Sequence, residues 1–145
     1  MRVLALDIGE VRVGVAVSDL GMRIASPVCV LPTTEVLAGA KSFQHVLEDW
    51  EPELLLCGLP YTMAGEEGPQ AERIKQAAAQ ISAVCNIPYE FTDERLSSAQ
   101  AKRSLREKGY TDKTMRGKID MIAASLFLQA WLDEHAAANE TNPER

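Results

Sequence analysis

The apolar residues in the first part of the chain follow the pattern of β-strands. Residues 2–8 form a nearly continuous apolar run, which is typical of a central strand buried on both faces. A tight turn is predicted at Gly9, and residues 11–18 then alternate between valines and small or polar side chains, as in a hairpin partner. A third strand is predicted over 24–31, and Pro27 places it at a sheet edge because proline has no N–H to donate.

From residue 36 onward the apolar positions recur mostly at helical spacing. Val36, Ala40, Phe43, Leu47 and Trp50 predict one helix between the third and fourth strands. The later predicted elements are a strand over 53–57, a helix over 71–81, a strand over 88–92, a helix from 97 or 98 to about 108, and a helix from about 115 to 135. The small and polar residues 136–145 are expected to form a flexible tail.

This order of elements predicts an α/β fold. Three antiparallel strands followed by two parallel strands form a five-stranded mixed sheet, flanked by α-helices. A length of 145 residues suits one domain, expected over 1–135. The chain contains neither an apolar run as long as a membrane span nor an N-terminal secretory signal, so we expect a cytoplasmic protein without a membrane partner.

The cysteines and histidines give no sign of a metal centre. The three cysteines lie far apart in the sequence, without a CxxC motif or a neighbouring histidine, so a zinc site is not expected. We interpret them as reduced, packed thiols.

The charge distribution is uneven. The chain carries a net charge of −6, yet residues 95–118 contain eight basic and two acidic side chains. A basic patch on an acidic protein is typical of a site that meets phosphates. An isolated run of charges is usually a solvated helix face. This run, however, lies between Glu94 and Asp120, which are candidates for catalysis for the reasons given below.

Three carboxylates occupy positions that a purely structural role explains poorly. Asp7 ends the first apolar strand, where burying a charge is unfavourable unless a cation or donors meet it. Backbone N–H groups of the Gly9 turn are the structural alternative. Asp120 falls at the edge of the apolar face of the last helix, where helix propensity does not favour it. Its alternative is a favourable position near a helix N-terminus.

The third acid, Glu94, follows the fifth strand. If the strand ending at 58–60 lies between the first and fifth strands, Asp7, Glu94 and Asp120 can converge near their carboxyl ends. Clustered carboxylates repel one another, and oxygen ligands suit Mg²⁺ or Mn²⁺. Two such ions about 4 Å apart would activate water and stabilise the leaving oxygen in phosphodiester cleavage.

Four segments of the chain resemble a known family. They are LALDIGEVRVGVAVSD (4–19), GLPYTMAGEEGPQA (58–71), TDERLSSAQA (92–101) and KIDMIAASLFLQAWLD (118–133). Together they are similar to the pre-16S rRNA nuclease family, also called YqgF or RuvX, of the RNase H-like superfamily.

The resemblance carries expectations about the site and the activity. It implies that Asp7, Glu94 and Asp120 are the catalytic and metal-binding acids of a divalent-metal nuclease. It also implies a role in maturing the 5′ end of 16S rRNA, although some members look like Holliday junction resolvases. This chain has Val11 where the family usually has lysine, and Ser98 where threonine is common.

Other residues are candidates for substrate contact or for loop shape. Nucleic acid is expected to contact Arg12, Arg95, Ser98, Lys102, Arg103, Arg106, Arg116 and Lys118. Arg12 could equally pair with a surface acid, Arg95 could pair with a neighbouring acid, and the solvated role is favoured for Lys118. Loop shape is expected to depend on Gly9, Gly58, Pro60 and Gly65. Asp93 is interpreted as a turn residue.

Two rival functions fit the same residues. One is a junction resolvase acting on branched DNA, and the other is a non-catalytic RNA-binding factor of ribosome assembly. An actin-like ATPase or sugar kinase is disfavoured because its two-domain clamp needs about twice the length of a single domain. The sequence is compatible with a monomer or a homodimer.

Overall fold

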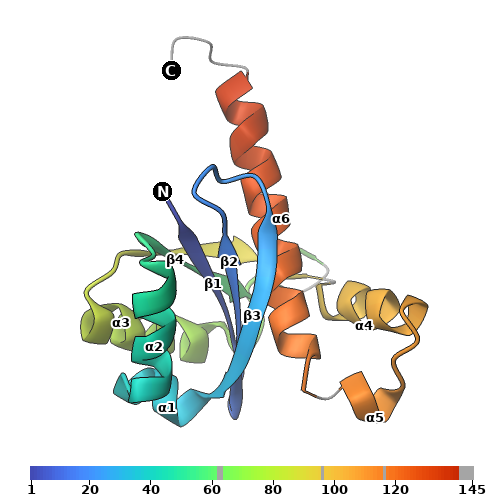
Figure 1. The fold of residues 1–145 in the computed structure, drawn as a ribbon, viewed down its shortest axis with the longest axis horizontal. Helices are drawn as coiled ribbons and strands as arrows, with labels where there is room; N and C mark the ends of the chain where they lie inside the picture. The colour runs from blue at the N-terminus through green and yellow to red at the C-terminus, as the bar shows by residue number, and fades with distance from the viewer. Residues whose placement is uncertain (62–63, 96, 116, 141–145) are drawn as a thin grey trace.

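A five-stranded mixed sheet forms the centre of the protein (Figure 1). The computed structural model describes residues 1–61, 64–95, 97–115 and 117–140. The strands are β1 (Val3–Ile8), β2 (Arg12–Ser18), β3 (Ala25–Pro32), β4 (Leu54–Leu59) and β5 (Tyr89–Asp93). Within the described residues, no helix combines the length and apolar character needed to cross a membrane.

The strand order is β3-β2-β1-β4-β5, which confirms the predicted fold class. The pairs β1–β2 and β2–β3 are antiparallel, whereas β4 runs parallel to both β1 and β5. The strand that contains Pro27 lies at the edge, as predicted. The most apolar strands, β1 and β4, lie side by side in the sheet interior, where neighbours on both sides complete their backbone hydrogen bonds.

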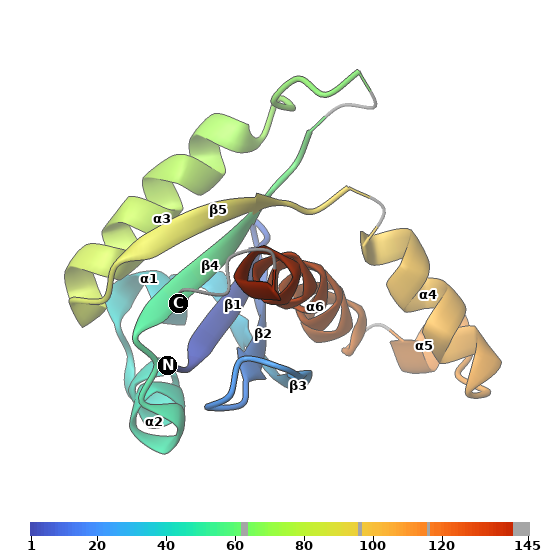
Figure 2. The same ribbon diagram turned by 90° about the horizontal axis from the view of Figure 1, so that it is seen from above.

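Helices cover both faces of the sheet (Figure 2). They are α1 (Thr33–Ala38), α2 (Lys41–Trp50), α3 (Ala71–Cys85), α4 (Ser97–Glu107), α5 (Asp112–Met115) and α6 (Ile119–Glu140). Figure 2 shows α1, α2 and α3 on one face and α6 on the other, with α4 and α5 beyond α6. We call these the α1–α3 face and the α6 face.

The alternation of side chains along β1 decides which residues reach each face. Leu4, Leu6 and Ile8 enter the core beneath α1–α3. Val3 and Ala5 enter the second core, beneath α6. Because side chains alternate with a period of two, Asp7 points to the α6 face.

The prediction of one helix between β3 and β4 was wrong. Gly39 adopts a left-handed conformation with φ of 64° and ends α1, and α2 starts two residues later. Left-handed glycine is the usual helix terminator because it carries no Cβ to clash. Val36 and Phe43 are nevertheless both fully buried, so the spacing identified the core positions but not the break.

The C-terminal helices also differ from the prediction. The segment expected to be a loop contains the short helix α5, and α6 starts at Ile119 rather than near Met115. At its other end α6 continues to Glu140, five residues beyond the expected end at His135. Three consecutive alanines, 136–138, favour this extension because alanine has the highest helix propensity.

The α6 helix approaches the sheet most closely at Gly14 of β2. A Cβ added at Gly14 would collide with the backbone C and O atoms of Asp120 and the backbone N of Met121. Gly14 is also the antiparallel partner of Asp7. The absence of one side chain therefore brings the first turn of α6 against the strand next to Asp7.

We expect Gly14→Ala to destabilise the fold by about 1–3 kcal/mol, because the added methyl group must push α6 away from β2. Urea unfolding followed by circular dichroism measures the change. Gly117→Ala is the matched control, since a Cβ there meets open space, and its effect should stay within about 0.5 kcal/mol. Equal stability of the two variants would show that the close approach is not a constraint.

Candidate active site

Glu94 is brought over the sheet by the ends of β4 and β5. Its backbone N–H donates to the carbonyl of Leu59 at 3.2 Å, which ties the start of the β5–α4 connection to the end of β4. A Cβ added at Gly58 would come within 2.6 Å of Glu94 Oε2 and 2.9 Å of Phe127 Cε2. The carboxyl group of Glu94 therefore lies across Gly58, on the α6 face of the sheet.

Gly58 was expected to shape a loop, and the structure corrects this. The residue lies inside β4, paired with Thr92 of β5. Its missing side chain leaves the space that Glu94 and Phe127 occupy. The apolar run that ends at residue 57 gave no indication that the strand continues through the glycine.

The carboxyl groups of Asp7 and Glu94 lie close enough for each to shift the pKa of the other. Burial, together with the negative charge of Glu94 and the hydrogen bond to it, raises the pKa of Asp7 from 3.8 to about 8. Burial also raises the pKa of Glu94, against the opposing effects of the hydrogen bond from Asp7 and the positive charge of Arg73. At neutral pH the pair therefore retains a proton.

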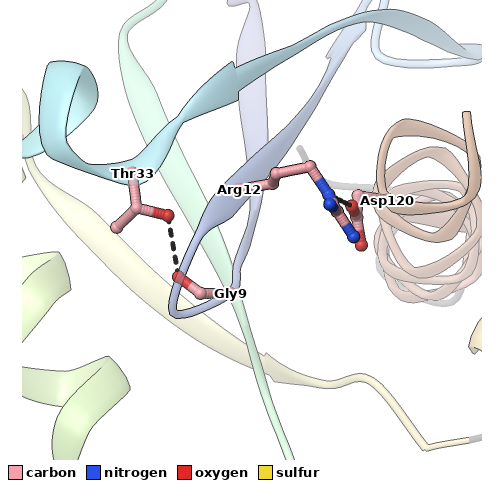
Figure 3. A network of polar contacts seen from close by, with 4 residues as sticks. All are labelled: Gly9, Arg12, Thr33 and Asp120. Carbon is pink, nitrogen blue, oxygen red and sulfur yellow. Dashed lines mark hydrogen bonds and ion pairs between the residues drawn. The ribbon is translucent and has the colours of Figure 1, made fainter. Parts of the chain in front are cut away.

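Asp120 lies in the first turn of α6, near this pair. Its negative charge adds to the rise in the pKa of Asp7. Its own carboxylate is ion-paired with Arg12, with 3.1 Å between Nε and Oδ2 (Figure 3). The three predicted acids thus occupy one region, although in the described part of the chain no three Asp, Glu, His or Cys side chains are grouped closely enough to hold a metal ion as they stand.

The donor chemistry fits a hard divalent cation. The three groups offer only carboxylate oxygens, which Mg²⁺ and Mn²⁺ prefer. A partly buried carboxyl pair whose pKa values are raised is a site that a cation could neutralise. Coordination by all three groups requires them to come closer together than they stand here.

Arg73, a residue that the sequence analysis missed, contributes positive charge to this region. Its Nη2 donates to the carbonyl of Ile8 at 3.2 Å and its Nε to Gln70 Oε1 at 2.8 Å. Arg73 lies in the first turn of α3, where the helix dipole disfavours a cation. This unfavourable position of Arg73 could have indicated from the sequence that the residue has a role outside the helix.

The turn between β1 and β2 is held by Thr33, a second residue that the sequence did not single out. The hydroxyl of Thr33 donates to the carbonyl of Gly9 at 2.8 Å (Figure 3). Its backbone N–H donates to the carbonyl of Val11 at 2.9 Å. Gly9 itself donates to the carbonyl of Arg12 at 2.8 Å, and a Cβ on Gly9 would lie 2.7 Å from that oxygen.

Backbone contacts join the two ends of the predicted loop that follows β4. Gly68 donates its N–H to the carbonyl of Pro60 at 2.6 Å, and Tyr61 pairs with Glu67. Gly65, in the same loop, has a φ of 86°, a conformation that favours glycine.

The basic stretch lies largely on α4. Lys102, Arg103 and Arg106 are exposed, whereas Ala101 and Leu105 are buried. The α4 helix packs against α6, the helix that carries Asp120. Basic side chains beside the carboxylates could hold phosphates next to them.

Four other residues were expected to contact nucleic acid. Two of them make local interactions, and the side chains of the other two lie outside the described part of the chain. Arg95 forms an ion pair with Asp93 at 2.7 Å, and Asp93 also accepts the backbone N–H of Arg95, as expected of a turn residue. The Nζ atom of Lys118 lies 5.7 Å from the centroid of the Tyr110 ring. The side chain of Ser98 and the whole of Arg116 lie outside what the structure describes.

The strand order, with helices on both faces of the sheet, is that of an RNase H-like α/β fold. The family model described as "RuvX: Holliday junction resolvase" matches residues 1–134. The chain belongs to this family.

Relatives and solved structures are similar to the chain over nearly its whole length. A relative from Anaeromyxobacter sp. (strain Fw109-5) is 38% identical, with 92% of this chain and 97% of the relative covered. One from Chloroflexus aurantiacus (strain ATCC 29366 / DSM 635 / J-10-fl) is 38% identical, with coverages of 99% and 91%. Both carry the name "Putative pre-16S rRNA nuclease".

Two solved structures share the fold. T. thermophilus RuvC in complex with Holliday junction substrate has a TM-score of 0.55 at 14% identity, covering 94% of this chain and 96% of that one. The Fowlpox virus resolvase in complex with its substrate Holliday junction DNA also has a TM-score of 0.55 at 14% identity, with coverages of 93% and 99%. At this identity the similarity establishes the fold alone.

The raised pKa of Asp7 predicts how stability depends on pH. Folded Asp7 retains a proton up to about pH 8, whereas unfolded Asp7 releases it near its ordinary value of 3.8. Between these values the folded state binds more protons, so the free energy of unfolding should fall as pH rises. We expect a loss on the order of a few kcal/mol, measured by urea unfolding in EDTA.

Asp7→Asn should flatten this pH dependence and be more stable than the wild type at pH 8, because asparagine cannot ionise. Asp49→Asn, an exposed position on α2, should keep the wild-type slope. A wild-type stability that rises from pH 4 to pH 8 would contradict the assignment of the proton to Asp7.

Proposed function

We propose that this protein is a divalent-metal-dependent nuclease that hydrolyses phosphodiester bonds in the 5′-end processing of pre-16S rRNA. The observation that carries the proposal is the partly buried Asp7–Glu94 pair with Asp120 beside it on the α6 face. The names of the relatives support the choice of precursor rRNA as substrate. A role in ribosome biogenesis would place the protein in the cytoplasm.

The metal site would be formed by Asp7, Glu94 and Asp120. Mg²⁺ or Mn²⁺ bound there would supply Lewis-acid stabilisation of the phosphate and of the leaving oxygen. The chain's own contribution is to hold two of the carboxylates on rigid elements, since Asp7 lies in β1 and the backbone of Asp120 is seated against Gly14. Glu94 follows the end of β5, and its N–H is bonded to the Leu59 carbonyl. Asp7 must give up its proton before all three groups can act as ligands.

The basic residues would bind the phosphates on either side of the scissile bond. Lys102, Arg103 and Arg106 lie exposed on α4, which packs on α6, the helix that carries Asp120. Further contacts are proposed for Arg95, Ser98, Arg116 and Lys118. Such contacts position the backbone without reading its sequence.

Holliday junction cleavage is the second candidate, because it is the activity named in the description of the matching family. The proposed metal site would serve either substrate, since the chemistry acts on a phosphodiester in both cases. A symmetric dimer with two sites facing one four-way junction would favour this candidate.

A non-catalytic RNA-binding role is less well supported. It would keep the basic face of α4 but leave two largely buried carboxyl groups without a purpose. Burying them raises the pKa of Asp7 to about 8, which marks an electrostatic cost to the fold. Perturbed groups of this kind are concentrated at functional sites.

The deciding experiment incubates the purified protein with precursor 16S rRNA and, separately, with a four-way DNA junction, each with Mg²⁺, Mn²⁺ or EDTA. We expect cleavage of the precursor rRNA near its 5′ end with either metal and none in EDTA. Cleavage of the junction alone would favour the resolvase. Binding of RNA without cleavage under any of these conditions would favour the assembly factor.

Substitution of the three acids tests the site itself. Asp7→Asn, Glu94→Gln and Asp120→Asn should each reduce cleavage by about 10³-fold or more, since residues that act as a unit fail together. The control is Asp93→Asn, which removes an acid adjacent to Glu94 that pairs with Arg95, and it should retain activity within about tenfold.

Stability separates a catalytic from a structural role for Asp120. Its ion pair with Arg12 joins side chains that are 28% and 57% exposed, so losing it should cost at most about 1 kcal/mol. Asp120→Asn should therefore remain folded, with an unfolding free energy close to that of the wild type. An unfolded Asp120→Asn protein would show that Asp120 is structural.

A further inference from the structure

The backbone positions of Arg12 and Asp120 place their side chains next to each other. Arg12 and Gly14 are two residues apart on β2, so both face α6. The backbone of Asp120 lies directly against Gly14. The turn before Arg12 is fixed as well, because Gly9 donates to the Arg12 carbonyl at 2.8 Å and Thr33 donates to the Gly9 carbonyl at 2.8 Å (Figure 3).

This ion pair neutralises one of the three acids. The guanidinium of Arg12 balances the charge of Asp120, with 3.1 Å between Nε and Oδ2. A divalent cation that binds the Asp120 carboxylate must displace this guanidinium.

We propose that Arg12 is a resident counter-cation of Asp120, which the divalent cation displaces and which then binds a phosphate of the substrate. The inference rests on the proposed metal site. It adds that the divalent cation replaces the Arg12 guanidinium as the partner of Asp120, and we call this replacement the exchange. Without metal, the Asp120 carboxylate is engaged by Arg12. With metal bound, Asp120 becomes a ligand and the guanidinium is available to the nucleic acid.

The surroundings of Arg12 allow this movement. Its side chain is 57% exposed, and exposed ion pairs contribute little to stability. Beside it lies a shallow pocket of about 300 Å³, lined by Val11, Arg12, Val30, Leu31 and Pro32. A guanidinium that leaves Asp120 therefore has open space next to it. Arginine also suits the second partner, because its planar donors bind phosphate oxygens in pairs.

Metal affinity provides the first test and does not depend on activity. Mn²⁺ binding to the metal-stripped full-length protein is measured by isothermal titration calorimetry. Arg12→Gln should bind Mn²⁺ about two- to fivefold more tightly than the wild type, because no guanidinium competes for Asp120. Lys118→Ala is the control: it removes an equal charge two residues from Asp120, but from a side chain that lies over Tyr110. Its affinity should change by less than about twofold.

RNA binding provides the second test. The affinity for a phosphorothioate RNA, used to suppress cleavage, is measured at several salt concentrations with Mn²⁺ and with EDTA. In Mn²⁺, Arg12→Gln should lower the slope of log affinity against log salt by about one phosphate contact. In EDTA the slopes of variant and wild type should coincide, because Arg12 is then engaged with Asp120.

The outcomes separate this inference from the proposed function. Weaker Mn²⁺ binding by Arg12→Gln, or a change equal to that of Lys118→Ala, would overturn the exchange while leaving the metal site intact. An equal loss of RNA affinity with and without Mn²⁺ would also overturn it. If the wild type bound no Mn²⁺, both the exchange and the metal site would fail.

Arg12→Lys keeps the test decisive if Arg12→Gln does not fold. Lysine retains the charge but lacks the planar pair of donors, so it should hold Asp120 less firmly. Its Mn²⁺ affinity should then lie above that of the wild type. An affinity equal to or below the wild-type value would overturn the exchange.

Discussion

The contact between the first turn of α6 and Gly14 of β2 is the constraint on which the site depends. It seats the backbone of Asp120 against the strand that pairs with Asp7. A second glycine, Gly58, does the same for Glu94 by leaving space above β4. Gly14 and Gly58 both lack a side chain at a point where an acidic residue from elsewhere in the chain approaches the sheet. The same two glycines therefore allow the close packing and bring the acidic residues together.

The three carboxyl groups repel one another when they are charged, and two features of the protein reduce this repulsion. Asp7 and Glu94 retain a proton, and Asp120 is paired with Arg12. Each solution is weaker than a divalent cation bound to three carboxylates would be, because a proton is lost with rising pH and an exposed ion pair is easily broken. The arrangement is consistent with a site that is stable without metal and able to accept it.

Much of the fold followed from local patterns, but the breaks between elements did not. The apolar runs and the position of Pro27 predicted a mixed sheet with its third strand at an edge, as observed. The helical spacing of the apolar residues gave no sign that the helix ends at Gly39. Val36 and Phe43, on either side of this break between α1 and α2, are both buried. Periodicity reports which residues face the core, whereas the end of a helix depends on the conformation of one residue.

The sequence by itself determined the chemical inventory: three acids at the ends of predicted elements, a basic stretch between two of them, and motifs of one family. Only the tertiary structure decided how these groups are paired. The structure brings together residues far apart in the chain: Asp7 with Glu94, Asp120 with Arg12, and the positive charge of Arg73 with Glu94. Such pairings depend on strand register and helix placement, which local residue preferences do not specify.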